Sequence, residues 1–211
     1  MQENKGLPKA TKKRLLQLLH LLGSWQNEKI KSGDIAELLS CKDSSVRHDV
    51  FLAGFGKGVS NGYSVIELRA FLEKLFGFET TETDDDECKK CCIVGLGRLG
   101  AALLDDSIFQ DSGFRVGCGF DSSVNRVEIL RSTFPLYPAF EMEAVLKKEK
   151  IEYAVLCVSE KDAQNMTERL VRFGIKGIVN MTRTFLIVPP EVKVINSSPV
   201  LALLGLVQTI E

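Results

Sequence analysis

Apolar residues along this chain recur either with a helical period or in short strand-like runs, and the helical period dominates the first third. Leu15, Leu18 and Leu22 recur every three or four residues and Gly23 follows them, which predicts a helix over residues 9–22. The stretch "VIELRAFLEKLFG" has the same spacing and predicts another helix. These patterns indicate a small, mainly helical core.

Two shorter helical patterns, separated by only "CKD", lie between these helices. In "SGDIAELLS" the expected N-cap is Ser32, and in "SVRHDVFLAGFG" it is Ser44 or Ser45. Two helices joined by so tight a turn indicate a helix-turn-helix, whose second helix enters the major groove of DNA. The second helix is expected to place Val46, Val50 and Phe51 inward and Arg47 and His48 outward.

The stretch "GKGVSNGYSV" predicts a small hairpin, or wing, because it combines glycines and Asn61 with alternating apolar residues. Two amphipathic helices with a short turn also occur in plain core packing, so that feature alone is not specific. The order helix, helix, turn, helix and hairpin within residues 1–78 favours a winged-helix DNA-binding domain.

A composition change follows at "ETTETDDDE", residues 79–87, which has no apolar periodicity and predicts a linker. Beyond it, strand-like runs ("CCIV", "FRVGCGF", "EYAVLCV", "GIVN") alternate with helical patterns ("EMEAVLKKEK", "KDAQNMTERLVRFG"). This alternation predicts an α/β domain with a Rossmann-like, doubly wound parallel sheet over residues 88–196.

A glycine pattern, Gly-x-Gly-x-x-Gly, begins directly after the first strand-like run, and "FRVGCGF" ends at Asp121, 21 residues beyond it. In a βαβ unit such glycines allow a tight turn and close approach of a pyrophosphate, and the acidic residue binds the ribose hydroxyls. A carboxylate there repels a 2′-phosphate, which favours NAD(H) over NADP(H), and Arg126 is the residue that could blunt this preference. Asn180 could equally cap a turn. The candidate cofactor-binding residues are Gly95, Leu96, Gly97, Arg98, Leu99, Gly100, Asp121, Cys157, Val158 and Asn180.

Groups for acid–base chemistry are scarce beyond the linker. Both histidines, His20 and His48, precede it, and no second substrate domain follows the nucleotide domain. A dehydrogenase needs a proton donor or acceptor near the nicotinamide. Lys176 or a cysteine could serve, but the expectation is a nucleotide-binding protein that is not an enzyme.

Charge is divided unevenly between the two regions. Residues 1–77 carry 12 Lys and Arg against 8 Asp and Glu, a net of +4, and the remainder carries a net of −5. This fits an anionic partner for the first region, although surface charge is often only solvated. No apolar run approaches the roughly 20 residues of a membrane span, and the first residues lack the apolar segment of a secretory signal, so a cytoplasmic location is expected.

Six cysteines are present, and only Cys88 and Cys91 have a metal-ligand spacing. No second pair of cysteines or histidines completes a ligand set, so no metal is expected. The strand-like surroundings of Cys91, Cys92, Cys118 and Cys157 predict small buried thiols.

Several segments in order resemble the Rex family of redox-sensing transcriptional repressors: "LPKATKKRL", "SSVRHDVFLAGFGKGVSNGYSV", "IVGLGRLGAALL" with "GFRVGCGFD", and "GIKGIVN". The resemblance implies a homodimer with an N-terminal winged helix and a C-terminal Rossmann domain. It also implies that NADH closes the dimer and releases operator DNA, whereas NAD+ permits DNA binding.

The resemblance further implies which residues touch DNA. Arg47 is the best candidate for a base edge, since its guanidinium suits guanine, and lysines would contact phosphates. His48 stands where the family usually has Lys or Arg. Histidine is mostly neutral at pH 7, so weaker or pH-dependent DNA contact is expected there, unless His48 is simply a solvated helix residue. The candidate DNA-binding residues are Lys9, Lys12, Lys13, Arg14, Ser44, Ser45, Arg47, His48 and Lys57.

The last segment, residues 197–211, is helix-like after Pro199 and apolar on nearly all faces. In the family this helix is exchanged between subunits, with an intrachain core helix as the alternative. Asp106 and Ser198 stand where the family has a tyrosine and an aspartate that form its switch. Three hypotheses therefore remain: an NADH-responsive repressor, a DNA-binding regulator that has lost the NADH response, and a small NAD-dependent oxidoreductase.

Overall fold

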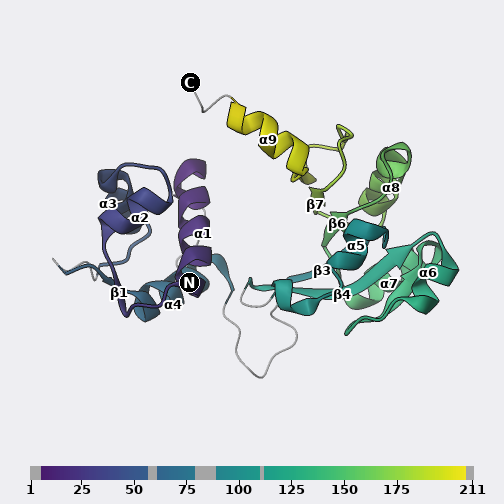
Figure 1. Cartoon of the computed structure of the whole chain (residues 1–211), viewed down its shortest axis with the longest axis horizontal. Helices are drawn as coiled ribbons and strands as arrows, with labels where there is room; N and C mark the ends of the chain where they lie inside the picture. Colours follow the sequence, from purple (N-terminus) through teal and green to yellow (C-terminus); the bar gives the residue numbers. More distant parts are fainter. Residues whose placement is uncertain (1–5, 57–60, 79–88, 110–111, 208–211) are drawn as a thin grey trace. The chain divides into compact units, whose positions relative to one another are not determined.

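The computed structural model describes residues 6–56, 61–78, 89–109 and 112–207. They belong to two compact units, one comprising Met1–Glu87 with Asp111–Gly113 and the other Cys88–Gln110 with Phe114–Glu211 (Figure 1). Each unit has a hydrophobic core of its own, so each is described by itself.

The first unit is a helical bundle with a two-stranded antiparallel sheet. Its core is built on fully buried side chains that include Leu15, Leu18, Ile35, Leu68 and Leu72. This arrangement is the predicted winged-helix fold. Its elements are α1 (Lys9–Ser24), β1 (Lys29–Ile30), α2 (Ser32–Leu38), α3 (Asp43–Leu52), β2 (Tyr63–Ser64) and α4 (Val65–Phe76).

The helix boundaries differ from the predictions at three places. Helix α1 continues through Gly23 to Ser24. Helix α2 begins at Ser32 rather than being capped by it, because the backbone N–H of Lys31 is bound by the Asp34 carboxylate at 3.1 Å. Helix α3 follows Lys42, so Ser44 and Ser45 lie inside its first turn and do not cap it.

Phe51 was predicted to face inward, and this was wrong. Its side chain is 76% exposed, whereas Val46, Val50 and Ala53 are buried. The helical period explains the difference, because one residue beyond Val50 lies about 100° around the helix from it. Phe51 therefore shares the solvent-facing side of α3 with His48.

The strand found in the predicted wing, β2, pairs with β1, which precedes α2 in the chain. Tyr63 pairs with Ile30 of β1, and Gly62 sits against the same strand with φ +94°. A Cβ at Gly62 would lie 2.7 Å from the Ile30 carbonyl oxygen, which explains the glycine. Lys57 and the predicted linker at 79–87 lie outside the described residues.

The second unit is a six-stranded, all-parallel sheet with strand order β5-β4-β3-β6-β7-β8. This is the order 3-2-1-4-5-6 of dinucleotide-binding folds, so the predicted doubly wound sheet is confirmed. The strands are β3 (Lys89–Val94), β4 (Phe114–Asp121), β5 (Leu136–Pro138), β6 (Tyr153–Leu156), β7 (Gly177–Asn180) and β8 (Lys193–Asn196). The helices are α5 (Arg98–Ala102), η2 (Asp106–Phe109), α6 (Val124–Ile129), η3 (Ala139–Glu141), α7 (Met142–Glu149), α8 (Glu160–Arg172) and α9 (Pro199–Val207).

Two apolar clusters cover the two faces of this sheet around β3. Cys92 and Val94 pack into one cluster and Cys91 and Ile93 into the other, as the two-residue period of a strand requires. The prediction of small buried thiols is confirmed for Cys91, Cys92 and Cys118, whereas Cys157 is only half-buried. Burial raises the pKa of Cys118, which keeps this thiol protonated and unreactive.

Two other kinds of site are absent from the described ranges. No helix there is long and apolar enough to cross a membrane. No group of three or more His, Cys, Asp or Glu side chains there is arranged to hold a metal ion.

Candidate functional site

A cavity of about 470 Å³ lies at the carboxyl ends of β3, β4 and β6. β3 and β6 are neighbours, and the chain leaves them toward opposite sides of the sheet, so the cavity opens at the topological switch point where such folds bind ligands. Its floor includes Gly95 and Gly97 from the glycine loop and Asp121 from the end of β4. The predicted motif and the predicted acidic residue are therefore brought together.

The glycine loop leaves no room for side chains at two positions. Gly95 has φ +90°, and a Cβ there would lie 2.8 Å from the Cys157 backbone. A Cβ at Gly100 would lie only 1.8 Å from the carbonyl oxygen of Gly95. Gly97, by contrast, has open space around it and precedes α5, so a ligand phosphate can approach the backbone at the start of that helix.

Asp121 is 3% exposed and bound on both oxygens. Its Oδ2 accepts from the Leu96 N–H at 2.7 Å and its Oδ1 from the Ser123 N–H at 2.8 Å. One Arg126 nitrogen, Nη1, lies 3.0 Å from Oδ1 and 2.9 Å from Oδ2. Burial by itself raises the pKa of Asp121, but these three donors outweigh it and hold the pKa below its ordinary value.

The remaining residues of the glycine motif and the β6 end fall into two groups. Cys157 and Val158 line the cavity, as predicted. Leu96 is buried beneath the loop, and Arg98 and Leu99 are exposed on α5. Burial raises the pKa of Cys157 to about 11, so its thiol is protonated at neutral pH.

Asn180 acts in a turn. It is fully buried, and its side-chain nitrogen donates to the Thr184 carbonyl at 2.9 Å while its oxygen accepts from the Thr182 hydroxyl at 2.7 Å. Of the two interpretations left open by the sequence, the structure supports the turn. The assignment of Asn180 as a cofactor ligand is corrected, because its amide is already bonded and is not among the residues that line the cavity.

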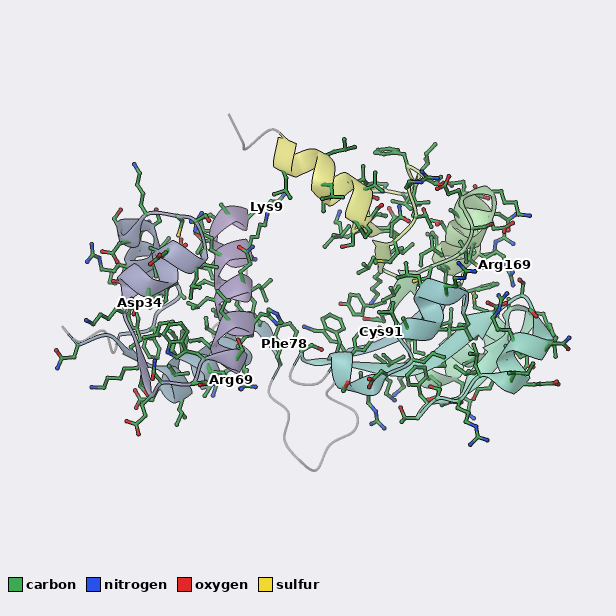
Figure 2. All side chains as sticks on the ribbon, viewed as in Figure 1. Lys9, Asp34, Arg69, Phe78, Cys91 and Arg169 are labelled. Carbon is green, nitrogen blue, oxygen red and sulfur yellow. The ribbon has the colours of Figure 1, made fainter. Side chains whose placement is uncertain are left out.

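One wall of the cavity, formed by α8, was not predicted from the sequence. Asp162, Asn165, Met166 and Arg169 all face it from α8 (Arg169 is labelled in Figure 2). Their spacing of three, four and seven residues places them on one helix face. That spacing is visible in the sequence, but only the sheet order shows that this face covers the switch point.

Lys176 lies at the edge of the sheet opposite the cavity. It directly precedes β7 and forms an ion pair with Glu152, which precedes β6. In a parallel sheet these amino ends lie at the edge opposite the cavity. The sequence left Lys176 open as an acid–base group, and its position argues against that role.

Helix α3 of the first unit presents a polar face. Ser44, Arg47 and His48 are exposed there, and Ser45 is half-buried. The Arg47 guanidinium lies 2.8 Å from the Asp43 carboxylate one turn earlier, in a pair whose side chains are 61% and 39% exposed. This exposure leaves Arg47 accessible to a ligand. On α1, Lys9 and Lys13 are exposed and Lys12 is half-buried.

Arg14 has a role that the sequence did not predict. Its Nη2 donates to Asp49 Oδ1 at 2.9 Å and its Nε pairs with Asp49 Oδ2 at 2.5 Å. The Thr11 hydroxyl donates to the same carboxylate at 2.7 Å, and Asp49 is 3% exposed. The DNA phosphate contact of Arg14 stays a prediction, although the buried Asp49 carboxylate has this guanidinium as its partner.

Comparisons with known proteins match both units. A family model described as CoA binding domain matches residues 86–184. The redox-sensing transcriptional repressor Rex 1 of Enterococcus faecalis is 31% identical over 196 residues, covering 90% of this chain and 86% of that protein. The repressor Rex of an Exiguobacterium species is 32% identical over 199 residues, covering 92% and 87%.

Solved structures agree with this match. The Rex-family repressor RSP in complex with β-NAD+ and operator DNA has a TM-score of 0.77 and 27% identity, covering 97% of this chain and 92% of that one. RSP in complex with β-NADH has a TM-score of 0.75 at the same identity, covering 97% and 94%. The likeness therefore extends over the winged helix and the parallel sheet together.

Proposed function

Because this chain belongs to the Rex family of redox-sensing transcriptional repressors, we propose that it is a cytoplasmic, dimeric repressor that binds a palindromic operator and responds to the NADH/NAD+ ratio. NADH is expected to release the operator. The relatives are named as repressors, and the proposal assigns this chain no catalytic activity.

One observation carries the proposal: a single chain combines an exposed recognition helix with a cavity at the switch point of a dinucleotide-binding sheet. Helix α3 presents Arg47 for base edges. The start of α5 lies at the cavity and is suited to bind the phosphates of a dinucleotide. Asp121, hydrogen-bonded to Arg126, lines the cavity at the end of β4, where a ribose is expected. A protein with both features is suited to couple nucleotide binding to DNA binding.

The first test is operator affinity at fixed salt, measured by fluorescence anisotropy with a labelled Rex-type palindrome. We expect NADH, but not NAD+, to weaken binding by at least about tenfold, since a coupling of this size is typical of allosteric sites. Arg47→Met is the control, because it should remove specific binding in the absence of any nucleotide. Specific binding that ignores both nucleotides would overturn the proposed redox response.

A second candidate function is a DNA-binding regulator that does not respond to NADH. Asp106 lies in η2 and Ser198 directly precedes α9. The resemblance assigns the family's switch pair to these two positions. Ser198 is 2% exposed, and its carbonyl oxygen accepts from the Ala202 N–H at 3.1 Å. A ligand that binds two conformations equally shifts nothing, so the operator titration separates the two candidates.

The dimer is supported by an apolar surface. Val200, Leu201, Leu203, Leu204 and Leu206 of α9 are between 42% and 62% exposed. An apolar helix with this exposure is typical of an element that another subunit covers. A second copy of this chain is the proposed partner.

The sheet has a matching apolar row. Ile93, Val155, Val179 and Ile195 are paired neighbours across β3, β6, β7 and β8, so their side chains share one face. Ile93 is fully buried, Val155 and Val179 are half-buried, and Ile195 is 64% exposed. Toward β8 this face therefore offers an apolar surface to a second subunit.

Leu203→Glu is expected to shift the protein from dimer to monomer at micromolar concentration, because it places a charge in an apolar contact. Light scattering after size exclusion would measure the mass, with Ile129→Glu, which makes the same change of charge at an exposed apolar residue of α6, as the control. An unchanged dimer in the Leu203→Glu variant would exclude α9 from the interface.

A further inference from the structure

The exposed face of α3 carries an aromatic side chain. Phe51 is 76% exposed, whereas Val50, the residue before it, is 3% exposed and belongs to the core. The other aromatic side chains described in the first unit are buried or half-buried. Among them, Phe55 packs against Tyr63 and Phe71, with ring centroids 6.2 and 5.2 Å apart. Phe51 therefore lies outside the core that holds these rings.

Phe51 shares its side of α3 with the residues proposed to contact DNA. Ser44, Arg47 and His48 are exposed, and Phe51 follows them by seven, four and three residues. Residues at these spacings lie on one face of a helix. A surface that meets DNA through Arg47 therefore brings the Phe51 ring against the DNA as well.

The distance between Arg47 and Phe51 along the helix fits the spacing of bases in a duplex. Four residues of an α-helix span about 6 Å. Successive bases along one strand of DNA are about 3.4 Å apart. In a recognition helix that lies along the major groove, Phe51 is then about two base pairs from the base that meets Arg47. Both side chains can contact bases of the same half-site.

The chemistry of the ring limits what it can recognise. Phenylalanine has no hydrogen-bonding group, so it cannot compensate a phosphate or a polar base edge for the water that it displaces. Thymine presents an apolar group in the major groove, its 5-methyl, and phenylalanine is one of the side chains that contact it. Contact between the ring and this methyl group removes apolar surface of both from water.

We propose that Phe51 contacts the 5-methyl group of a thymine in the major groove of the operator, about two base pairs from the base that Arg47 reads, and so adds to sequence specificity. The inference rests on the proposed DNA-binding function and deepens it by naming a further base contact. The partner is DNA and not a second subunit, because the ring shares its face with Ser44, Arg47 and His48, whereas the exposed apolar residues of α9 form a contiguous surface.

The test removes single methyl groups from the DNA. In the labelled palindrome, thymines are replaced by deoxyuridine, one symmetric pair at a time, and the affinity of the full-length protein is measured by fluorescence anisotropy at fixed salt. We expect at least one pair to weaken binding by about fivefold or more, since a methyl contact is lost in each half-site. Affinity that ignores deoxyuridine at every position would overturn the proposal and leave DNA binding standing. Absence of specific binding to the palindrome would overturn both.

Phe51→Ser separates the ring from the response of the DNA itself, because a base substitution also changes the shape and stiffness of the duplex. The variant should bind the thymine palindrome more weakly and lose the response to deoxyuridine at that one pair. Ile66→Ser is the matched control, because Ile66 is also 76% exposed but lies on α4, and it should keep the wild-type response. Both side chains are exposed, so urea unfolding followed by Trp25 fluorescence should match wild type.

Two results with Phe51→Ser would contradict the assignment. An equal response to deoxyuridine in wild type and Phe51→Ser would give the methyl contact to another residue. A loss of dimer mass in Phe51→Ser would place the ring in a contact between subunits. Either result would overturn the proposal.

Discussion

Alanine at position 100 is expected to abolish nucleotide binding and to destabilise the second unit, while the first unit keeps its fold. The new Cβ would lie 1.8 Å from the Gly95 carbonyl oxygen and 2.9 Å from its carbonyl carbon. Both contacts are to backbone, so α5 and the glycine loop must separate. Overpacking of this kind costs about 1–3 kcal/mol, and the displaced loop carries the Leu96 N–H that binds Asp121.

Alanine at position 97 is the matched variant. A Cβ there meets nothing within 4 Å, so Gly97→Ala should fold with unchanged stability. Because Gly97 borders the cavity, the added methyl group should still weaken dinucleotide binding by blocking close approach of the pyrophosphate. The pair thus separates the glycine that packs helix against loop from the glycine that faces the ligand.

The sole tryptophan of the chain, Trp25, makes the measurement specific to one unit. Its indole N–H donates to the Lys29 carbonyl at 3.2 Å inside the first unit. Its fluorescence should report the same urea transition in wild type and Gly100→Ala, while far-UV circular dichroism shows an earlier transition for the remaining structure. Unchanged NADH affinity in Gly100→Ala would contradict the described loop geometry.

The strands and the glycine motif could be predicted because their signals are local. A strand buried on both faces reads as a continuous apolar run, and "CCIV" followed by glycines is such a run. The N-cap positions of α2 and α3, Lys31 and Lys42, could not be predicted from the usual capping residues, because lysine does not belong to that set. Phe51 was placed inward beside Val50 although adjacent residues lie about 100° apart around a helix, and the packing of α3 shows that Val50 is the one that is buried.

The sequence predicted the position of the candidate site but not most of the contacts between its residues. Asp121 was located correctly at the end of β4, and Arg126 was named as the residue that could modify its effect. The direct hydrogen bonds from Arg126 to Asp121 depend on the way α6 folds back, which the sequence does not show. The α8 wall required the sheet order, and the turn of Asn180 required the path of the chain through Thr184. The sequence therefore identified the charged residues of the site by type, and the structure showed which hydrogen bonds they form.

Asp49 illustrates the same limit in the first unit. The sequence offered Arg14 as a charged surface residue, and the structure joins it to a carboxylate 35 residues away on α3. Burial by itself raises the pKa of Asp49, but hydrogen bonds from Arg14 and Thr11 outweigh it and hold the pKa below its ordinary value. The pair connects α1 to α3, the helix that also carries Arg47.

Arg14→Met is therefore expected to lower the free energy of unfolding of the first unit by about 3 kcal/mol at pH 7, because it leaves a buried carboxylate without its cation. Arg47→Met is the matched control on α3. Its ion pair with Asp43 is largely exposed, so its loss should cost less than about 1 kcal/mol while specific DNA binding disappears. Urea unfolding followed by Trp25 fluorescence would measure both values.

The pH dependence of the two proteins should have opposite signs. In wild type the native-state pKa of Asp49 lies below the unfolded-state value, so its stabilisation is complete above the unfolded-state pKa and is lost as pH falls through the native one. In Arg14→Met burial is no longer outweighed and raises the pKa of Asp49, so acidification protonates the carboxylate and relieves the penalty. The difference in unfolding free energy between wild type and Arg14→Met should therefore shrink between pH 7 and about pH 4. A difference that stays constant across this range would show that Arg14 stabilises the unit by packing alone.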